Sequence, residues 1–420
     1  MPRPIAGTAR ATSKNSKLAQ TYRRFAEVDA PKISPLYERI ARALSESPEA
    51  LRAIETAPTR KRNPLLILAA LHHLALTNQS PTLTTAYSAI TAPAAPATST
   101  APIAPTPSAA SAPAAASTTA AASAPAADSD AAAGSDAVAS ADVAAYGDLA
   151  VDAAVRTLVG MTDAVVAVVG QRKVRANVLG NHAVLYPAIA EVARRAGAGA
   201  IGLIDVGSPA GFNLNVDRAG INYGDGQTLG DPSSPVQASA SVVGDRPIPT
   251  YAMPEVVARI GIDLQLIDTR DADEAQWLRA CVPPDQPELI ARLEGELELA
   301  ASAPPILMHG DKVDLLPEAL ARVPADALPV VTTTWALSDL SLESRLRFLQ
   351  CLDAAATNRP VAWVSVEGVG VAPAIPTFGD RPASGHSIIG LAVFNHSTLQ
   401  AEGVGRCWLR GQMLAWLADS

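Results

Sequence analysis

Hydrophobic residues in the second half of the chain occur as short continuous runs, separated by stretches of helical periodicity. Runs bounded by turn residues are typical of buried parallel strands, and the stretches between them are typical of covering helices. The clearest run is Ala-Ile-Gly-Leu-Ile-Asp-Val at 200–206, and further strands are predicted at 306–309, 329–334 and 360–366. This alternation predicts an α/β fold with a Rossmann-like, doubly wound and mostly parallel sheet over 199–420.

The intervening sequence predicts helices, because its apolar residues recur three or four positions apart. These helices are expected at 274–281, 287–300 and 342–355. Two final apolar runs, at 388–394 and 404–408, predict an antiparallel pair of strands at the end of the domain.

Four polar residues in the first part of the chain stand directly before a proline, a signal for the start of a helix. The polar side chain accepts a hydrogen bond from an otherwise unpaired N–H, and proline suits the first helical position because it has no N–H. These signals predict a helical subdomain over 17–90. They occur at Ser34-Pro35, Ser47-Pro48, Asn63-Pro64 and Ser80-Pro81.

Further helices that pack on the core are predicted over 141–198. The pattern of apolar residues favours one long helix from about 146 to 169 and a second helix at about 182–195.

Two segments carry too few large side chains to build a core. From about 91 to 140 the chain is almost entirely Ala, Pro, Ser and Thr, and this composition predicts a disordered linker. Residues 1–16 contain Arg3, Arg10 and Lys14 but no acidic residue, and we expect a flexible basic tail there.

Composition and charge limit the classes of function. The chain is 48% hydrophobic and 18% charged, which fits a folded protein with a substantial core, and its net charge of −8 disfavours general nucleic-acid binding. Three well-separated cysteines in no CxxC pattern predict neither a disulfide framework nor a cysteine metal site. The longest apolar run, at 65–76, is too short to cross a bilayer. We therefore expect a cytoplasmic protein that binds a small molecule, with no metal, nucleic acid or membrane as partner; the oligomeric state is left open.

The turn after the first predicted strand is the strongest candidate for a ligand site. Its sequence is Asp205-Val-Gly-Ser-Pro-Ala-Gly211. Ligands of open α/β sheets bind at the carboxyl ends of strands, where glycine lets the backbone approach a ligand or adopt a positive φ. A helix after such a turn offers unpaired N–H groups. We predict cofactor contacts from Asp205, Gly207, Ser208 and Gly211; a tight turn without a ligand is the alternative.

Acidic residues that could face the same ligand are expected at the ends of the second and third strands. Asp311 follows the strand at 306–309, and its alternative role is a helix cap. Gly261-Ile-Asp263 resembles the end of a second strand, although it lies more than fifty residues after the glycine turn. Two other readings remain open, namely a helix over 255–260 capped by Gly261, and Asp225 as the acid.

Four further polar residues are candidate substrate contacts. Arg172 and Asn177 precede the first strand, and a guanidinium group suits a carboxylate. Asn213 follows the glycine turn, and Glu367 follows the strand at 360–366. The alternatives are surface charge for the first two, a helix cap for Asn213 and a structural acid for Glu367.

The order of these features resembles that of class I S-adenosylmethionine-dependent methyltransferases. In that family an acid at the end of the third strand commonly faces the adenine ring, so the resemblance implies this role for Asp311. It also implies that the glycine turn holds the methionine part of S-adenosylmethionine. A catalytic constellation is not required, because methyl transfer depends mainly on orientation.

Several segments together resemble a bacterial family known as domain of unknown function 2332. The resemblance covers nearly the whole chain outside the Ala/Pro-rich segment and implies a shared fold. The segments are Phe25-Ala26, Ser34-Pro-Leu-Tyr-Glu38, Asp205-Val-Gly-Ser-Pro-Ala-Gly-Phe-Asn-Leu214, Asp217-Arg218, Gly230-Asp-Pro-Ser-Ser-Pro235, Gly261-Ile-Asp263, Trp277-Leu-Arg-Ala-Cys-Val282, Gly310-Asp311 and Trp363-Val-Ser-Val-Glu-Gly368. The family tends to have Gln-Thr-Asn-Glu where Arg175-Ala-Asn-Val178 stands, and Ala where Pro209 stands.

The leading hypothesis is an S-adenosylmethionine-dependent, methyltransferase-like protein. The alternative is a non-catalytic Rossmann-like binding or scaffold protein, which the departures at 175–178 and at Pro209 favour. A nicotinamide-dependent oxidoreductase is disfavoured, because the turn has the pattern GxxxG rather than GxGxxG.

Overall fold

The computed structural model describes residues 17–91, 147–174, 179–224, 226–396 and 398–419. The predicted basic tail and the Ala/Pro-rich segment beyond Thr91 lie outside the described residues. The chain forms two compact units. Unit 1 comprises the described residues up to Lys173 together with Pro283–Gln286, and unit 2 comprises those of Val174–Val282 and Pro287–Ser420.

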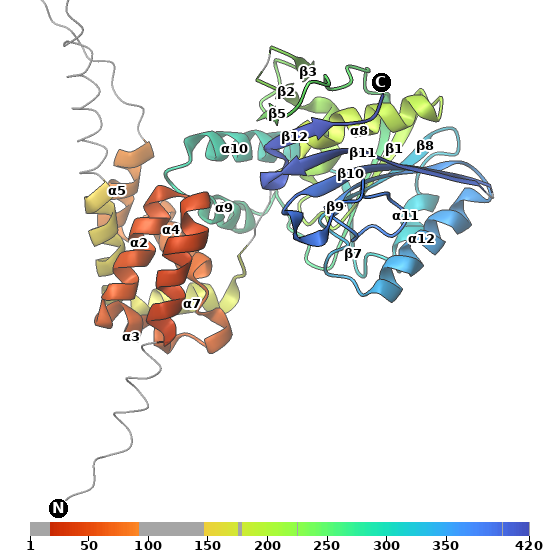
Figure 1. The fold of residues 1–420 in the computed structure, drawn as a ribbon. Coiled ribbons are helices and arrows are strands. Elements are labelled where there is room, and N and C mark those ends of the chain that lie inside the picture. The colour runs from red at the N-terminus through yellow and green to blue at the C-terminus, as the bar shows by residue number, and fades with distance from the viewer. Residues whose placement is uncertain (1–16, 92–146, 175–178, 225, 397, 420) are drawn as a thin grey trace, which may run out of the picture. The chain divides into compact units, whose positions relative to one another are not determined.

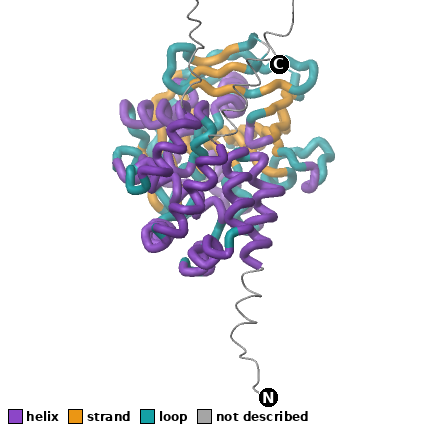
Figure 2. The backbone as a smooth tube through the Cα atoms, turned by 90° about the vertical axis from the view of Figure 1, so that its left-hand side faces the viewer, coloured by secondary structure: helices purple, strands orange, loops and turns teal. Residues whose placement is uncertain are grey.

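Helices make up the described part of unit 1 (Figure 2). They include α2 (Pro35–Glu46), α3 (Pro48–Thr56), α4 (Pro64–Leu76), α5 (Pro81–Thr91), the helix Gly147–Gly160 and α7 (Thr162–Gln171). All four predicted helix starts are confirmed, and the side chains of Ser34, Ser47 and Asn63 accept hydrogen bonds from the first turns of α2, α3 and α4. The Ser80 hydroxyl instead pairs with that of Thr157 at 2.8 Å.

The prediction of one long helix from about 146 to 169 is wrong. The helix Gly147–Gly160 and α7 meet at an angle of 87°. The break falls at Met161, whose φ of −124° and ψ of 34° are not helical, directly after a glycine of low helix propensity. Among the described residues no single helix is both long and apolar enough to span a membrane, and only this bent pair passes the same test when joined.

Unit 2 is built on a nine-stranded, mostly parallel sheet with the order β5-β12-β11-β10-β9-β8-β1-β6-β7 (Figure 1). The four pairs from β9 to β7 are parallel, and β9, β10, β11 and β12 pair in antiparallel fashion. The strands are β1 (Ala200–Val206), β5 (Ser241–Val242), β6 (Glu255–Asp263), β7 (Ile306–His309), β8 (Leu328–Thr334), β9 (Val361–Gly368), β10 (Ser387–Asn395), β11 (Thr398–Trp408) and β12 (Met413–Trp416). This confirms a mixed α/β fold and the predicted antiparallel pair at the end.

Alternate residues of each strand point to opposite sides of the sheet, so apolar side chains lie on both faces. Helices cover both of these faces. Ile201 and Leu203 pack in one cluster with α8 (His182–Arg195). Ile204 and Val206 pack in another with α11 (Leu316–Ala321) and α12 (Leu342–Ala356), and Figure 1 shows these helices on the opposite side of the sheet from α8. Two further helices, α9 (Ala272–Cys281) and α10 (Pro287–Ser302), pack together in a third cluster.

The long segment of chain between β1 and β6, the first two parallel strands in the sequence, contains a small second sheet. Its strands are β2 (Gly220–Asn222), β3 (Thr228–Gly230) and β4 (Gln237–Ser239). The segment 255–263 then forms β6, parallel to β1, so the alternative of a helix at 255–260 is wrong.

Strand order reverses at β1. The next two parallel strands of the chain, β6 and β7, add on one side of β1, whereas β8 and β9 add on the other. In open parallel sheets the connections diverge at such a point and leave a crevice at the carboxyl ends of the strands. The fold therefore places a crevice directly beyond Val206, where the glycine turn begins.

In unit 1, Asp285 binds the start of α2. Its Oδ1 accepts a hydrogen bond from the Ser34 hydroxyl at 2.6 Å, and its Oδ2 accepts one from the backbone N–H of Leu36 at 2.9 Å. We predict that Asp285→Ala lowers the free energy of unfolding by about 1–3 kcal/mol, because two donors lose a charged acceptor. Urea denaturation followed by circular dichroism measures this, with the exposed Asp268→Ala as control; equal stability of the two variants would contradict the prediction.

Candidate functional site

A pocket of about 570 Å³ lies within unit 2 at the carboxyl ends of β1, β6, β7 and β8. This volume suits a small-molecule ligand. The glycine turn, the ends of β6 and β7, and the loop after β8 all contribute to its lining. Of the predicted site residues, the lining contains Gly207, Ser208, Gly211, Asn213, Asp263 and Asp311.

Asp205 lies beneath the pocket and does not line it. The residue is 1% exposed, and its two carboxylate oxygens accept hydrogen bonds from the Thr332 hydroxyl at 2.6 Å and from Asn213 Nδ2 at 2.9 Å. Burial raises the pKa of Asp205, and these hydrogen bonds oppose the shift. Both oxygens therefore have partners inside the protein, and Asp205 orders the turn rather than offering a free carboxylate.

Asn213 connects three segments at the edge of the pocket. Its Nδ2 donates to Asp205 and also to the Thr334 hydroxyl at 3.0 Å, while its Oδ1 accepts from the backbone N–H of Asn181 at 2.7 Å. The amide is thus used fully by the protein. Asn213 lines the pocket and positions its walls.

A buried polar pair, Glu296 and His182, fixes the chain on both sides of Asn181. Glu296 on α10 accepts a hydrogen bond from the backbone N–H of Gly180 at 3.0 Å and pairs with His182 Nε2 at 2.8 Å. Both side chains are fully buried. The start of α8 is therefore held in place immediately beside the pocket.

The glycine turn is shaped mainly by the protein itself. Gly207 has a φ of +86° and Gly211 a φ of +75°, a region that favours glycine. A Cβ atom on Gly207 would lie 2.7 Å from Ala336 Cβ, and one on Gly211 would lie 2.7 Å from Pro305 Cγ. Either side chain would therefore clash with the protein.

The turn offers a ligand fewer free backbone N–H groups than its sequence indicates. The amides of Gly207 and Ser208 both donate to the carbonyl of Ile262, at 2.8 and 3.3 Å, and Pro209 has no N–H. The next segment, Phe212–Arg218, is a 3₁₀ helix with a kink at Asn215. A helix therefore follows the turn, as expected, but it is a short 3₁₀ segment that leads into the small sheet and not a regular α-helix.

Asp263 ends β6, Asp311 follows the adjacent parallel strand β7, and both line the same pocket. Asp263 Oδ1 accepts a hydrogen bond from the backbone N–H of Gln265 at 2.7 Å. Asp311 Oδ1 accepts from the N–H groups of Val313 and Asp314 at 2.9 and 3.1 Å, so it caps the turn before α11. Among the described residues, none donates a hydrogen bond to the Oδ2 atom of either carboxylate.

Two cationic residues that line the pocket were not predicted from the sequence. Lys312 Nζ donates to the carbonyl of Ala336 at 3.3 Å and would lie 3.4 Å from a Cβ on Gly207. Its position directly after Asp311 could have marked Lys312 as a pocket residue from the sequence alone. Arg410, between β11 and β12, places its guanidinium carbon Cζ over the Trp335 ring, 5.4 Å from the ring centroid, and no motif marked it.

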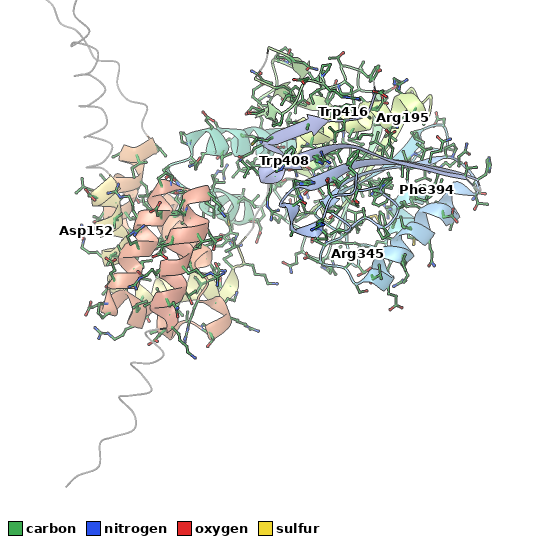
Figure 3. All side chains as sticks on the ribbon, viewed as in Figure 1. Asp152, Arg195, Arg345, Phe394, Trp408 and Trp416 are labelled. Atoms are coloured by element: carbon green, nitrogen blue, oxygen red, sulfur yellow. The ribbon has the colours of Figure 1, made fainter. Side chains whose placement is uncertain are left out.

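Glu367, at the end of β9, is absent from the residues that line the pocket and supports one of its walls. It is 1% exposed, and Oε1 accepts from the backbone N–H groups of Ala336 and Leu337 at 2.9 and 3.1 Å. Burial raises the pKa of this carboxyl to about 7, although the two amides act to lower it. On α12, Arg345 (labelled in Figure 3) donates to the carbonyls of Leu337 and Leu340 at 2.9 and 3.1 Å and so holds the same loop.

Of the two remaining predicted contacts, one belongs to unit 1 and the other is not among the described residues. Arg172 belongs to unit 1, where its carbonyl accepts a hydrogen bond from Lys61 Nζ at 2.7 Å. Asn177 lies outside the described residues, as does Asp225, the alternative acid. Within the described ranges, no three His, Cys, Asp or Glu side chains converge to hold a metal ion.

Comparison with known proteins identifies the family. A family model described as "Uncharacterized protein conserved in bacteria (DUF2332)" matches residues 19–126 and 103–416. The chain belongs to this family. The family resemblance noted from the sequence is thereby confirmed. No curated protein and no solved structure matches the chain.

The raised pKa of Glu367 predicts a pH-dependent effect on stability. The unfolded carboxyl titrates near its ordinary value of 4.5 and the folded one near 7, so the folded state retains a proton that the unfolded state has lost. The contribution of Glu367 to the free energy of unfolding therefore falls as the pH rises from about 4.5 to about 7 and is constant above. At 1.36 kcal/mol per pKa unit, the fall is on the order of 3 kcal/mol.

Glu367→Gln removes this titration. Its free energy of unfolding, minus that of the wild type, should increase by that amount between pH 4.5 and 7. Urea denaturation at four or five pH values gives the difference. A difference that does not change with pH would show that Glu367 titrates normally.

Proposed function

We propose that unit 2 is a Rossmann-like, doubly wound domain and that its pocket binds S-adenosylmethionine, as in an S-adenosylmethionine-dependent methyltransferase-like enzyme. The observation that carries the proposal is the meeting of Asp263, Asp311 and the glycine turn in one pocket at the point where strand order reverses. A ribose diol and an adenine amine are hydrogen-bond donors, and an ionised carboxylate is purely an acceptor. Asp263 would take the ribose hydroxyls and Asp311 the adenine amine, each with its Oδ2 atom.

The hydrogen bonds of the turn favour this ligand over a dinucleotide. A pyrophosphate group is normally held by backbone N–H groups at a glycine turn and a helix N-terminus. Here the amides of Gly207 and Ser208 are used by Ile262, Pro209 has none, and the following helix is a short 3₁₀ segment. A ligand without phosphates is recognised through side chains, which this pocket supplies.

The methionine part has a matching environment near the turn. Its carboxylate would face the ammonium group of Lys312, the cation beside Gly207. Ser208 and Gly211 line the adjacent wall. Asp205 acts indirectly, by holding Asn213 and the turn in place.

Bound S-adenosylmethionine supplies an electrophilic methyl group, which passes to a nucleophile and leaves S-adenosylhomocysteine. The protein contributes mainly orientation of an in-line approach, which is a large effect in itself. A non-catalytic binding protein is the second candidate, favoured by Pro209, which removes one amide from the turn. Both candidates bind S-adenosylmethionine, but only the methyltransferase-like enzyme transfers its methyl group.

The proposal predicts that S-adenosylhomocysteine binds and that both strand-end acids contribute. Asp263→Asn and Asp311→Asn should each raise the dissociation constant about 10- to 100-fold, because a donor replaces an acceptor of about 1.5–3 kcal/mol. Isothermal titration calorimetry with S-adenosylhomocysteine measures this, and adenosine should show the same ranking of variants.

Asp314→Asn is the matched control, because Asp314 forms an exposed ion pair with Arg347 and does not line the pocket. Its affinity should equal that of the wild type. If the wild type shows no binding at millimolar S-adenosylhomocysteine, the proposal is wrong.

A further inference from the structure

The side of the pocket that follows β8 has a different chemistry from the side that follows β6 and β7. Trp335 stands directly after β8, with its Nε1 donating to the Ser387 hydroxyl at 2.8 Å. This hydrogen bond fixes the indole ring at the pocket. The guanidinium group of Arg410 lies over that ring in a cation–π contact. The proposed adenosine contacts, Asp263 and Asp311, lie on the other side of β1 in the strand order.

Both partners of this cation–π pair have unusual backbone conformations. Trp335 has a φ of +53°, Arg410 a φ of +54° and its neighbour Leu409 a φ of +47°. Left-handed backbone is unfavourable for residues with a Cβ and persists where the surrounding structure requires it, often at functional sites. Here the strain brings an aromatic ring and a guanidinium group together at the wall of a pocket.

Stacking leaves the hydrogen-bonding edge of an arginine available. The N–H groups point outward in the plane of the guanidinium group, so a stacked arginine still binds an oxyanion with two parallel hydrogen bonds. Among the described residues, no ion pair or hydrogen bond involves the Arg410 side chain, whereas nearby Arg406 donates twice to Asp380. Arg410 is exposed at the edge of the pocket, and partial desolvation lowers the pKa of its guanidinium group.

We propose that Arg410, supported by Trp335, binds an oxyanion of the methyl acceptor, either a carboxylate or a phosphate group. This inference rests on the proposed function, since it divides the pocket into an adenosyl side at Asp263 and Asp311 and an acceptor side at Arg410. The division uses the two cations for different groups. Lys312 Nζ lies beside Gly207 and the Ala336 carbonyl, where it would meet the methionine carboxylate, and Arg410 lies over the Trp335 ring.

The test uses the full chain and three aromatic probes: benzoate, phenyl phosphate and neutral benzamide. Each probe is titrated by calorimetry into the wild type, Arg410→Ala and Arg410→Lys, with and without saturating S-adenosylhomocysteine. Benzoate or phenyl phosphate should bind the wild type at least about 10-fold more tightly than Arg410→Ala, with Arg410→Lys between them, since lysine keeps the charge but lacks the fork. Which of the two anions binds identifies the oxyanion.

Two controls keep the outcomes distinct. Arg347→Ala removes an exposed arginine outside the pocket and should bind every probe as the wild type does. Arg410→Ala should retain the wild-type affinity for S-adenosylhomocysteine, which also shows that it is folded. Anion binding that is equal in the wild type and Arg410→Ala, or benzamide binding as tight as that of the anions, would overturn the inference. Anion binding that depends on Arg410 without any binding of S-adenosylhomocysteine would overturn the proposed function and leave the oxyanion site standing.

Discussion

The buried carboxylate of Asp205 is the group on which the geometry of the pocket depends. A carboxylate removed from water requires hydrogen-bond partners, and Asp205 finds them in Thr332 on β8 and in Asn213 beyond the glycine turn. Asn213 extends the network to Thr334 and to the backbone of Asn181 at the start of α8. A single buried group therefore couples β1 and the segment after the glycine turn to β8 and to the start of α8, and these walls of the pocket resist movement because each would lose a hydrogen bond on moving.

The parallel strands could be predicted because buried strands have continuous apolar runs, and the helices because they occupy the stretches between these runs. The run at 200–206 is β1 residue for residue, and the helix expected at 182–195 is α8. The break at Met161 could not be predicted, because apolar periodicity continues through it. The role of Asp263 stayed open for a topological reason, since the small sheet inserted between β1 and β6 hides the usual spacing of strand ends.

The candidate site was predicted best where residues follow strands and least where contacts come from distant loops. The glycine turn, Asp263 and Asp311 meet in one pocket because carboxyl ends of neighbouring parallel strands share an edge. Asp205 and Glu367 were recognised as polar strand ends, but only the structure shows that backbone or side-chain donors of the protein use them. Arg410 had no sequence signal, because it reaches the pocket from the turn between two antiparallel strands late in the chain.

The proposed function requires an adenosyl ligand between the acidic strand ends and the glycine turn. A crystal structure of the chain grown with saturating S-adenosylhomocysteine tests it most directly. We expect ribose density beside Asp263, adenine density beside Asp311 and an unchanged hydrogen bond between Asn213 and Asp205. Density for the ligand at another place, or a pocket that remains filled with water alone at saturation, would contradict it.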